Sequence, residues 1–548
     1  MIQIQFSKVS LTLGARSIFR DLDWEIQEDQ KIGLIGPNGA GKSSLFKLIT
    51  GEFACEPGGS VTRARAVTVG YLAQQPELPV ELTALECVLA YTPRICEIRS
   101  ELSEIERQFA DPNVYSDNRL LARTVDRQML LLEEYQTLGG DQFEQRVEAL
   151  LFSLGLPEDD LCKPVGLLSG GQRKLIGLAG LLLLSPQLLL LDEPDNHLDL
   201  AAKQFLEKTI REYQGTVVII SHDRYLLDAA VSHIAELEDG CLTVFPGDYS
   251  SYILDKEQRL ARQDELYHIQ QRQISRIETA IKRYQVWAKT YDNEKFAKRA
   301  RAIQNRLDHM DRVEKPVLER RRMDLRLNGW RGSQKVLECS HLNKAFDSQP
   351  LFQDVNLILH HGERVGVIGR NGSGKSVLFK MILHEMEPDA GEIVIGPNIA
   401  AGYYAQEHET LNPDQTVLDV VRLAGGLSES RGVSFLQRFL FTYRQTSQPV
   451  RELSGGERSR LQLALVVLSG ANFLLLDEPT NNLDIASAEV LEAALSDFEG
   501  TVLVISHDRY FLDQVVDRVV VLDEGNLPGY PGNYSDYLSG SVIQPVVR

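Results

Sequence analysis

The apolar positions of this chain follow two rhythms, and the first is a set of short, unbroken apolar runs. Each run has four or five residues and leads into a glycine-rich, acidic or Ser-His stretch. Runs of this length are typical of strands buried on both faces of a parallel sheet. They predict the central strands of an α/β fold. The runs are 32–35, 188–191, 216–220, 365–368, 473–476 and 501–505.

The second rhythm is helical and extends over 256–310. Apolar residues recur there every seven positions and then by steps of four and three, which predicts two helices packed as an antiparallel hairpin. We place its tip near 286–293 and the end of its second helix at Pro316. The apolar positions are Leu260, Tyr267, Ile274, Ile277, Ile281 and Tyr284, then Phe296, Ala300, Ile303, Leu307 and Met310.

A shorter helical pattern lies at about 92–145, around a polar turn at 111–113. It predicts two amphipathic helices that form a hairpin arm. The alternative, a helical insert that only caps its domain, stays open.

Two of the apolar runs lead into the pattern G-x-x-x-x-G-K-[ST]. Glycines allow consecutive backbone N–H groups to curl around phosphate oxygens, the lysine reaches the β- and γ-phosphates, and the serine hydroxyl ligates Mg²⁺. Both stretches therefore predict a nucleoside triphosphate site. The residues are Gly36, Pro37, Asn38, Gly39, Ala40, Gly41, Lys42, Ser43 and Ser44 in the first stretch, and Gly369, Arg370, Asn371, Gly372, Ser373, Gly374, Lys375 and Ser376 in the second.

The chain is a tandem duplication, because three landmarks follow both phosphate loops in the same order. The first landmark lies farther from its loop in the first copy, from Gly36 to Ser169, than in the second, from Gly369 to Ser454. The match of 71–74 with 403–406 places the extra length after Gln74, where we predict the arm. The landmarks are 168–172 with 453–457, 221–225 with 506–510, and 245–249 with 530–534.

Two of the buried runs end in paired acids, Asp192-Glu193 and Asp477-Glu478. A parallel strand beside a phosphate loop delivers such carboxylates to the bound phosphates. We assign Asp192 and Asp477 to the Mg²⁺ shell, and Glu193 and Glu478 to positioning and polarising the attacking water.

His222 and His507 follow two further apolar runs. A single histidine in such a place is more often a packing residue. Because these two recur in register, we favour a contact to the γ-phosphate.

Charge is distributed unevenly along the chain. The net charge is −19, yet 256–335 contains 21 Lys or Arg against 11 Asp or Glu, so that a basic insert interrupts an acidic protein. Such a hairpin could neutralise RNA phosphates, with Trp287 and Tyr291 stacking on bases, although a solvated coiled coil is the alternative. The basic residues near the tip are Lys282, Arg283, Lys289, Lys295, Lys298, Arg299, Arg301 and Arg306.

The six cysteines are scattered and form no C-x-x-C pair, which argues against a disulfide framework or a zinc module. No apolar run approaches the roughly 18 residues of a membrane span. The first six residues alternate like a strand rather than a signal peptide. We expect a cytoplasmic protein without a membrane partner.

These motifs, together with LSGGQ at 168–172 and LSGGE at 453–457, resemble those of the ATP-binding-cassette ATPases. The resemblance implies that the LSGGQ-type loop of each cassette closes over ATP held by the other, so that a monomer contains two composite sites. Site one would combine Lys42, Ser43, Gln74, Asp192, Glu193 and His222 with Ser454, Gly455, Gly456 and Glu457. Site two would combine Phe346, Lys375, Ser376, Gln406, Asp477, Glu478 and His507 with Ser169, Gly170, Gly171 and Gln172. Gln74 and Gln406 would join the Mg²⁺ shell.

Within that superfamily the chain is most similar to the soluble ABC-F translation factors. The segments EPDNHLD at 193–199 and EPTNNLD at 478–484 are close to the group's EPTNHLD, and a charged linker separates the cassettes. The resemblance implies cassettes at 1–252 and 335–548, joined by the helical hairpin at 253–334. It also implies that the hairpin enters the ribosomal E site near the P-site tRNA, that the 92–145 arm touches ribosomal RNA or protein, and that hydrolysis releases the protein.

Three positions depart from the family pattern. Asp195 replaces a threonine, and Asn482 replaces a histidine. The adenine-stacking aromatic of the family matches Phe346, whereas the first copy has Leu13, so we expect site one to bind adenine less tightly. A transporter ATPase subunit and a DNA-maintenance clamp remain alternatives, and the sequence leaves open whether the role is housekeeping or antibiotic resistance.

Overall fold

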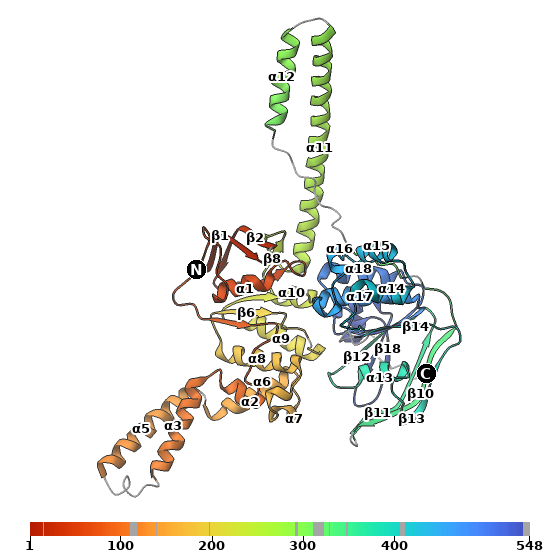
Figure 1. Ribbon diagram of the computed structural model, residues 1–548. Helices are drawn as coiled ribbons and strands as arrows, with labels where there is room; N and C mark the ends of the chain where they lie inside the picture. Colours follow the sequence, from red (N-terminus) through yellow and green to blue (C-terminus); the bar gives the residue numbers. More distant parts are fainter. Residues whose placement is uncertain are drawn as a thin grey trace. The chain divides into compact units, whose positions relative to one another are not determined.

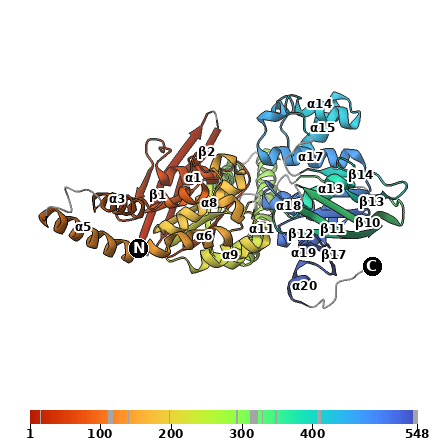
Figure 2. The same ribbon diagram turned by 90° about the horizontal axis from the view of Figure 1, so that it is seen from below.

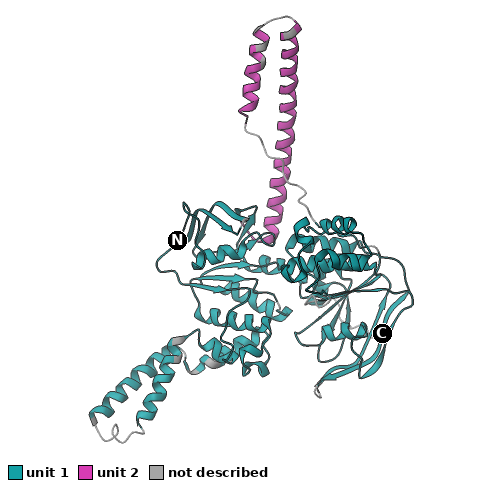
Figure 3. Cartoon of the chain, in the orientation of Figure 1, with its two compact units in different colours: residues 1–244, 323–548 teal, residues 245–322 magenta. Residues whose placement is uncertain are grey.

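The computed structural model describes residues 1–14, 16–109, 118–138, 140–196, 198–290, 294–310, 323–327, 329–346, 349–405 and 411–540. The chain forms two compact units, one of residues 1–244 with 323–548 and one of residues 245–322 (Figure 3). Unit 1 contains both copies of the repeat. Outside the described residues lie Gln406, Pro316, the predicted arm turn at 111–113 and the tip residues 291–293.

Each cassette is built on a six-stranded sheet. The strands of the first are β3 (Lys31–Ile35), β5 (Val69–Leu72), β6 (Leu188–Asp192), β7 (Thr216–Ile220), β8 (His233–Glu238) and β9 (Cys241–Pro246). Those of the second are β12 (Arg364–Gly369), β14 (Ala401–Tyr404), β15 (Phe473–Asp477), β16 (Thr501–Ile505), β17 (Arg518–Leu522) and β18 (Gly529–Pro531).

The strand order is the same in both cassettes, β5-β6-β7-β3-β8-β9 and β14-β15-β16-β12-β17-β18. The first five strands of each sheet run parallel. Every residue of β6, β7, β15 and β16 is buried. This confirms the α/β fold predicted from the apolar runs. In each sheet the strand that ends in the histidine motif lies between the phosphate-loop strand and the acidic strand, so the three motifs meet at one edge.

A three-stranded antiparallel sheet completes each cassette, in the orders β2-β1-β4 and β11-β10-β13. Helix α1 (Lys42–Thr50) shares one apolar core with β1 and β6, through Phe46 among other residues. Its counterpart α13 (Lys375–Ile382) is packed in the same way. Both helices that follow the phosphate loops are thus fixed by the core. The strands are β1 (Ile2–Leu13), β2 (Arg16–Gln27), β4 (Ser60–Arg63), β10 (Lys335–Phe346), β11 (Gln349–His360) and β13 (Ala390–Ile395).

The remaining helices of the cassettes also repeat. In the second cassette, α14, α15 and α17 gather on one side, and β10, β11 and β13 lie on the other (Figures 1 and 2). The first cassette has α2 (Ala84–Leu89), α6 (Phe143–Ser153), α7 (Glu158–Leu161), α8 (Gly170–Leu184), α9 (Leu200–Glu212) and α10 (Arg224–Ala230). The second has α14 (Val417–Gly425), α15 (Glu429–Arg438), α16 (Tyr443–Thr446), α17 (Gly455–Ser469), α18 (Ile485–Ser496), α19 (Arg509–Val515) and α20 (Tyr534–Leu538).

Helices α3 (Pro93–Phe109) and α5 (Asn118–Thr137) pack on each other and extend from the first cassette (Figures 1 and 2). Ile98, Ile105 and Leu131 form a small apolar core between them. Arg94 binds Glu134 through two hydrogen bonds of 2.7 and 2.6 Å. The amphipathic pattern at 92–145 therefore corresponds to a helix pair with its own core.

Unit 2 is a helical hairpin of α11 (Tyr249–Thr290) and α12 (Glu294–Asp308). The rings of Tyr284, Trp287 and Phe296 connect the helices, with centroids between 5.7 and 6.3 Å apart. Ile281 and Leu307 are buried. Trp287 thus contributes to the packing of the hairpin, and it is also 36% exposed, so the predicted stacking on RNA bases stays a prediction.

The helical unit begins and ends earlier than the predicted linker of 253–334. Helix α11 begins at Tyr249, and Met323 and Leu325 are buried in the apolar core of the second cassette. Arg438 also donates a hydrogen bond of 3.0 Å to Asp324. The compact helical unit is thus 245–322, whereas the resemblance implied a linker of 253–334, because the segment from Met323 packs on the cassette through its apolar positions. Among the described residues, no helix combines the length and apolar character needed to cross a bilayer.

Candidate active site

Each phosphate loop folds so that its lysine turns back over the loop. Lys42 Nζ donates hydrogen bonds to the carbonyl oxygens of Gly36 at 2.7 Å and Pro37 at 3.2 Å. Lys375 Nζ makes the same two bonds in the second copy, both at 2.9 Å. Burial lowers the pKa of both lysines. A bound phosphate would supply the counter-charge that these buried ammonium groups need.

The glycine before each lysine is required by the backbone. Gly41 has a φ of 103° and Gly374 a φ of 102°, a region that favours glycine. A Cβ on Gly41 would lie 2.3 Å from Ile18 Cγ2, and one on Gly374 would lie 2.7 Å from Leu351 Cδ2. Any other residue would push the loop away from the core and from its phosphate-binding shape.

The two glutamates after the acidic strands share an uncommon backbone conformation. Glu193 and Glu478 both have a φ of 50°, in the left-handed region. The N–H of Glu193 donates to the carbonyl of Ile220 at 2.8 Å, and that of Glu478 donates to Ile505 at 2.9 Å. A strained backbone that neighbouring strands hold in place is typical of functional sites, where it aims a side chain.

Burial dominates the electrostatics of the acid pairs. It raises the pKa of Asp192 and of Glu193, and the negative charge of Asp192 raises the pKa of Glu193 further. In the second copy, burial and the charge of Asp477 raise the pKa of Glu478 to about 7. A carboxylate with a raised pKa is a better proton acceptor, which suits a residue that polarises water.

The first acid pair fits a divalent cation. Asp192 Oδ2 is buried and has no hydrogen-bond partner among the described residues. The Ser43 hydroxyl hydrogen-bonds to the same carboxylate. Gln74 Nε2 instead donates to Glu193 Oε2 at 2.8 Å, so the structure brings it to the site but onto the glutamate. An unpartnered carboxylate oxygen beside a hydroxyl is the donor set that Mg²⁺ prefers.

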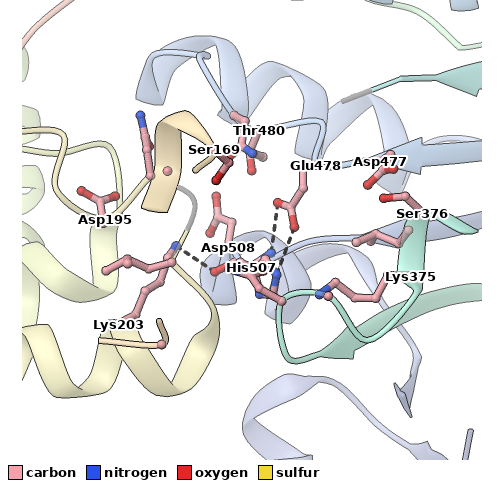
Figure 4. A pocket seen from close by; sticks show the side chains of 18 of the residues that line it. Ser169, Asp195, Lys203, Lys375, Ser376, Asp477, Glu478, Thr480, His507 and Asp508 are labelled. Carbon is pink, nitrogen blue, oxygen red and sulfur yellow. Dashed lines mark hydrogen bonds and ion pairs between the residues drawn. The ribbon is translucent and has the colours of Figure 1, made fainter. Parts of the chain in front are cut away.

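Both histidines lie beside their glutamates. His222 Nε2 is 3.9 Å from Glu193 Oε1, and His507 Nε2 is 3.6 Å from Glu478 Oε1. The backbone N–H of His507 also donates to Glu478 Oε2 at 3.2 Å (Figure 4). Burial lowers the pKa of His222 to about 3 and the pKa of His507 well below its ordinary value. Both rings are neutral at pH 7 and can donate one N–H to a phosphate oxygen.

Residues of both cassettes line one cavity of about 940 Å³, which holds most of the second site and also Glu193 and His222 of the first. Figure 4 shows Ser169 of the first cassette on the same cavity as Lys375, Asp477, Glu478 and His507 of the second. Ser169 is the N-cap of α8 and accepts a hydrogen bond from the N–H of Gln172 at 3.2 Å. The predicted site residues on the cavity wall are Ser169, Gly170, Gly171, Gln172, Glu193, His222, Phe346, Asn371, Gly372, Gly374, Lys375, Ser376, Asp477, Glu478 and His507.

At the first site, the phosphate loop touches the opposite cassette directly. Asn38 Nδ2 donates to the carbonyl of Asn482 at 2.9 Å, and the Asn38 N–H donates to Asp484 Oδ2 at 3.2 Å. A Cβ on Gly456 would lie 2.8 Å from Asn38 Nδ2, so the LSGGE glycine permits this approach. The matching bond of the second site, from the Asn371 N–H to Asp199 Oδ2, is longer at 3.5 Å.

Known proteins are similar to nearly the whole chain. A family model described as ABC transporter matches residues 19–196 and 352–481, and a second model with the same description matches 235–327. The translational throttle protein EttA of Escherichia coli strain K12 is 34% identical over 95% of this chain and 92% of its own length. ABC transporter F family member 5 of Arabidopsis thaliana is 34% identical over 95% of this chain and 75% of its own length.

This chain belongs to the ABC-F family of ATP-binding-cassette ATPases. Among solved structures, the archaeal ribosome recycling factor aABCE1, in complex with the stalk protein aP1, matches this ABC-F chain with a TM-score of 0.59. That match covers 97% of this chain and 92% of the other at 19% identity. At this identity the match shows the shared fold of tandem cassettes.

The structure accounts for two departures of this ABC-F protein from its family. Asn482 has a φ of 64°, which asparagine tolerates better than most residues, and its carbonyl binds Asn38. Asp195 is buried, and burial raises its pKa to about 6 although the nearby Lys203 charge opposes this. Phe346 lines the cavity and is 44% exposed, and Leu13, at the matching position of the first copy, is 41% exposed.

Several other residues that join the cassettes were not predicted from the sequence. Asp199 and Asp484 cap α9 and α18 and contact the opposite phosphate loops. Both end the repeated segments at 193–199 and 478–484, so the repeat contained a signal for them.

Two crossed ion pairs also join the cassettes. Arg224 Nη2 lies 2.5 Å from Glu492 Oε1, and Arg509 pairs with Glu207. Each arginine also lies over a tyrosine ring of the opposite cassette, Arg224 over Tyr510 at 4.0 Å and Arg509 over Tyr225 at 4.9 Å. When the repeats are aligned through their Ser-His-Asp motifs, Arg224 matches Arg509 and Glu207 matches Glu492, so the two ion pairs occupy equivalent positions.

Proposed function

We propose that this ABC-F ATPase binds the ribosome in its ATP-closed state and leaves after hydrolysis, so that it acts in translation. The proposal places the helical hairpin in the E site, next to the P-site tRNA, and the α3–α5 arm on ribosomal RNA or protein. Support comes from the name of the relative EttA, a translational throttle, and from its 34% identity over nearly the whole chain.

The observation that carries the proposal is the pairing of two ATP sites with a basic hairpin in one chain. Within the helical unit, 245–322, 18 Lys or Arg stand against 12 Asp or Glu, in a protein of net charge −19. Cations spaced along a helix neutralise nucleic-acid phosphates without reading base sequence. A ribosomal RNA surface is therefore a better partner for this unit than a basic protein surface.

Within each site we propose the following roles. Lys42 and Lys375 bind the β- and γ-phosphates, Glu193 and Glu478 orient the attacking water, and neutral His222 and His507 donate to the γ-phosphate. Mg²⁺, when bound, neutralises charge on the β- and γ-phosphates. The residues proposed to hold it are Ser43, Gln74 and Asp192 in site one, and Ser376, Gln406 and Asp477 in site two.

We infer that ATP favours the closed state because its phosphates contact both cassettes. Each phosphate loop lies near the LSGG segment of the other cassette, so a γ-phosphate can be held from both sides only when the cassettes are together. Hydrolysis removes that shared group. A protein in DNA maintenance or transport would use the same ATP-dependent closure of the cassettes, but on a different partner.

The experiment is ribosome co-sedimentation of the Glu193→Gln/Glu478→Gln variant with ATP. We expect it to pellet with ribosomes and to inhibit translation, because it binds ATP but does not hydrolyse it. Lys42→Ala/Lys375→Ala is the matched control and should stay in the supernatant. If the glutamine variant is released from ribosomes normally, or pellets with membranes or duplex DNA instead, the proposal is wrong.

A further inference from the structure

One buried lysine crosses from the first cassette to the second ATP site. Lys203 is part of α9, and its side chain is 10% exposed. Its ammonium donates to Asp223 Oδ2 of the same cassette at 2.9 Å. It also donates to the backbone carbonyl of His507 in the other cassette, again at 2.9 Å (Figure 4).

This bond completes a two-sided hold on the backbone of His507. The peptide group before His507 donates its N–H to Glu478 Oε2 at 3.2 Å. The peptide group after His507 accepts from Lys203. Because both flanking peptides are fixed, the His507 imidazole and the Glu478 carboxylate keep the same distance and orientation relative to each other. One of the two fixing groups comes from the opposite cassette.

The second cassette has an alanine where the first has this lysine. Alignment of the repeats through Ser221 and Ser506 pairs Lys203 with Ala488 and Asp195 with Thr480. Alanine has no amine to donate to the carbonyl of His222. Lysine and aspartate thus appear together in the first cassette, and both are replaced at the matching positions of the second.

The surroundings of Lys203 explain why both are present. A buried ammonium is stable only with counter-charges and hydrogen bonds. Asp223 pairs with it, and the charges of Asp195 and Asp508 also raise its pKa. Asp195 also lines the same cavity as Lys203 and His507. Asp195, which departs from the family pattern, is therefore one of the nearby charges that keep Lys203 protonated.

We propose that Lys203 is a positioning residue of the second ATP site. Its side chain, from the first cassette, fixes the backbone of His507, so hydrolysis at the second site depends on this contact. The first site lacks the contact because the matching residue, Ala488, has no amine. The proposal rests on the roles given above to Glu478 and His507, but not on the ribosome as partner.

The test measures single-turnover ATP hydrolysis by the full chain, with enzyme in excess and without ribosomes. In a Glu193→Gln background, where only site two hydrolyses, Lys203→Ala should slow the reaction about tenfold, as expected for a lost hydrogen bond from a charged donor. The enzyme concentration that gives half the maximal rate should change less than about twofold, because the lysine does not touch the nucleotide. Lys208→Ala, an exposed lysine on the same helix, is the matched control.

The reciprocal background separates positioning from general damage. With Glu478→Gln, where only site one hydrolyses, Lys203→Ala should leave the rate within about twofold of its parent. Equal losses at both sites would overturn the proposal. So would a loss that consists of weaker ATP binding. If Glu478→Gln itself leaves site two active, the role assigned to Glu478 is wrong. That result would refute the proposed function of the site, and it can be told apart from a failure of the role of Lys203.

Removing Lys203 alone leaves Asp195 and Asp223 buried near each other, and that variant can lose its fold. The double variant Asp195→Thr/Lys203→Ala avoids this, since it installs the residues of the second copy. We expect a Tm close to that of the parent, together with about the same tenfold loss at site two. A wild-type rate in the double variant, or its failure to fold, would give the pair a structural role only and overturn the proposal.

Discussion

At the scale of single residues, the two ATP sites of this chain differ in the groups that would meet the base. Phe346 lies on the wall of the cavity that both cassettes line, and Lys344 Nζ is 5.7 Å from the centre of its ring. Leu13 occupies the corresponding place in the first copy. An aromatic ring stacks on adenine, whereas a leucine offers apolar contact only.

We therefore predict that Phe346→Ala weakens ATP binding at site two and leaves site one unchanged. The loss of one stacking contact corresponds to about a fivefold rise in Kd. Titration of a fluorescent ATP analogue into the Lys42→Ala background reports on site two alone. Leu13→Ala in the Lys375→Ala background is the control, and we expect it to change the Kd less. Equal residual affinity of the Lys42 and Lys375 variants would contradict the difference between the sites.

The buried histidines link stability to pH. Burial lowers the pKa of His222 from 6.5 to about 3, so the folded chain keeps this ring neutral while the unfolded chain protonates it. The stabilisation is complete above the unfolded pKa and is lost as pH falls from 6.5 towards 3. Between pH 7 and pH 5 the loss amounts to about 2 kcal/mol.

We predict that the Tm of the wild-type chain falls between pH 7 and pH 5, and that His222→Gln makes this fall smaller. Calorimetry of both proteins at the two pH values measures the difference. A slope that is identical in the variant would show that this ring does not contribute.

At the scale of elements, helices α9 and α10 meet α18 and α19 through the crossed pairs of Arg224 with Glu492 and Arg509 with Glu207. The side chains of Arg224 and Glu492 are 4% and 9% exposed. A buried pair that loses one partner leaves an uncompensated charge, which is far more destabilising than the loss of a surface pair.

We predict that Arg224→Glu destabilises the contact between the cassettes by about 3 kcal/mol or more, and that adding Glu492→Arg restores part of the loss. ATP-dependent closure, followed by fluorescence energy transfer between labels on the two cassettes, measures both steps. The control is Arg94→Glu/Glu134→Arg, which exchanges the charges of an exposed pair within the arm. It should not affect closure. An Arg224→Glu variant that closes like the wild type would refute the role of the pair.

The elements that could be predicted from the sequence are those whose signals are local. Apolar runs and duplicated motifs predicted the strands, the phosphate loops and the acids, because each is local and occurs twice. The hydrogen bond from Lys203 to His507 joins residues that are 304 positions apart in the sequence, and the second cassette has no lysine at the position that matches Lys203. No pattern could point to it. The contact of Trp287 with Phe296 was not predicted either, because the two rings lie on different helices of the hairpin.

At the scale of the whole molecule, each cassette contributes to the site of the other. Gly456 of the second cassette approaches Asn38 in the phosphate loop of the first. A change in one cassette should therefore stop hydrolysis in the site whose lysine belongs to the other.

We predict that Gly456→Val abolishes hydrolysis at site one, since a Cβ there would lie 2.8 Å from both Asn38 Nδ2 and the carbonyl oxygen of Asn482. Single-turnover hydrolysis in the Glu478→Gln background measures this loss. In the Glu193→Gln background, site two should retain most of its rate. Loss confined to site two would show that the sites form within each cassette rather than across the two.

The crossed pairs have a consequence for the halves of the chain. Each half contains both an arginine and a glutamate of the contact, Arg224 with Glu207 and Arg509 with Glu492. A surface with both members is self-complementary, as a two-fold symmetric homodimer requires. Two copies of the first half, produced without the second, could therefore associate through Arg224 and Glu207 alone, each copy standing in for the missing cassette of the other.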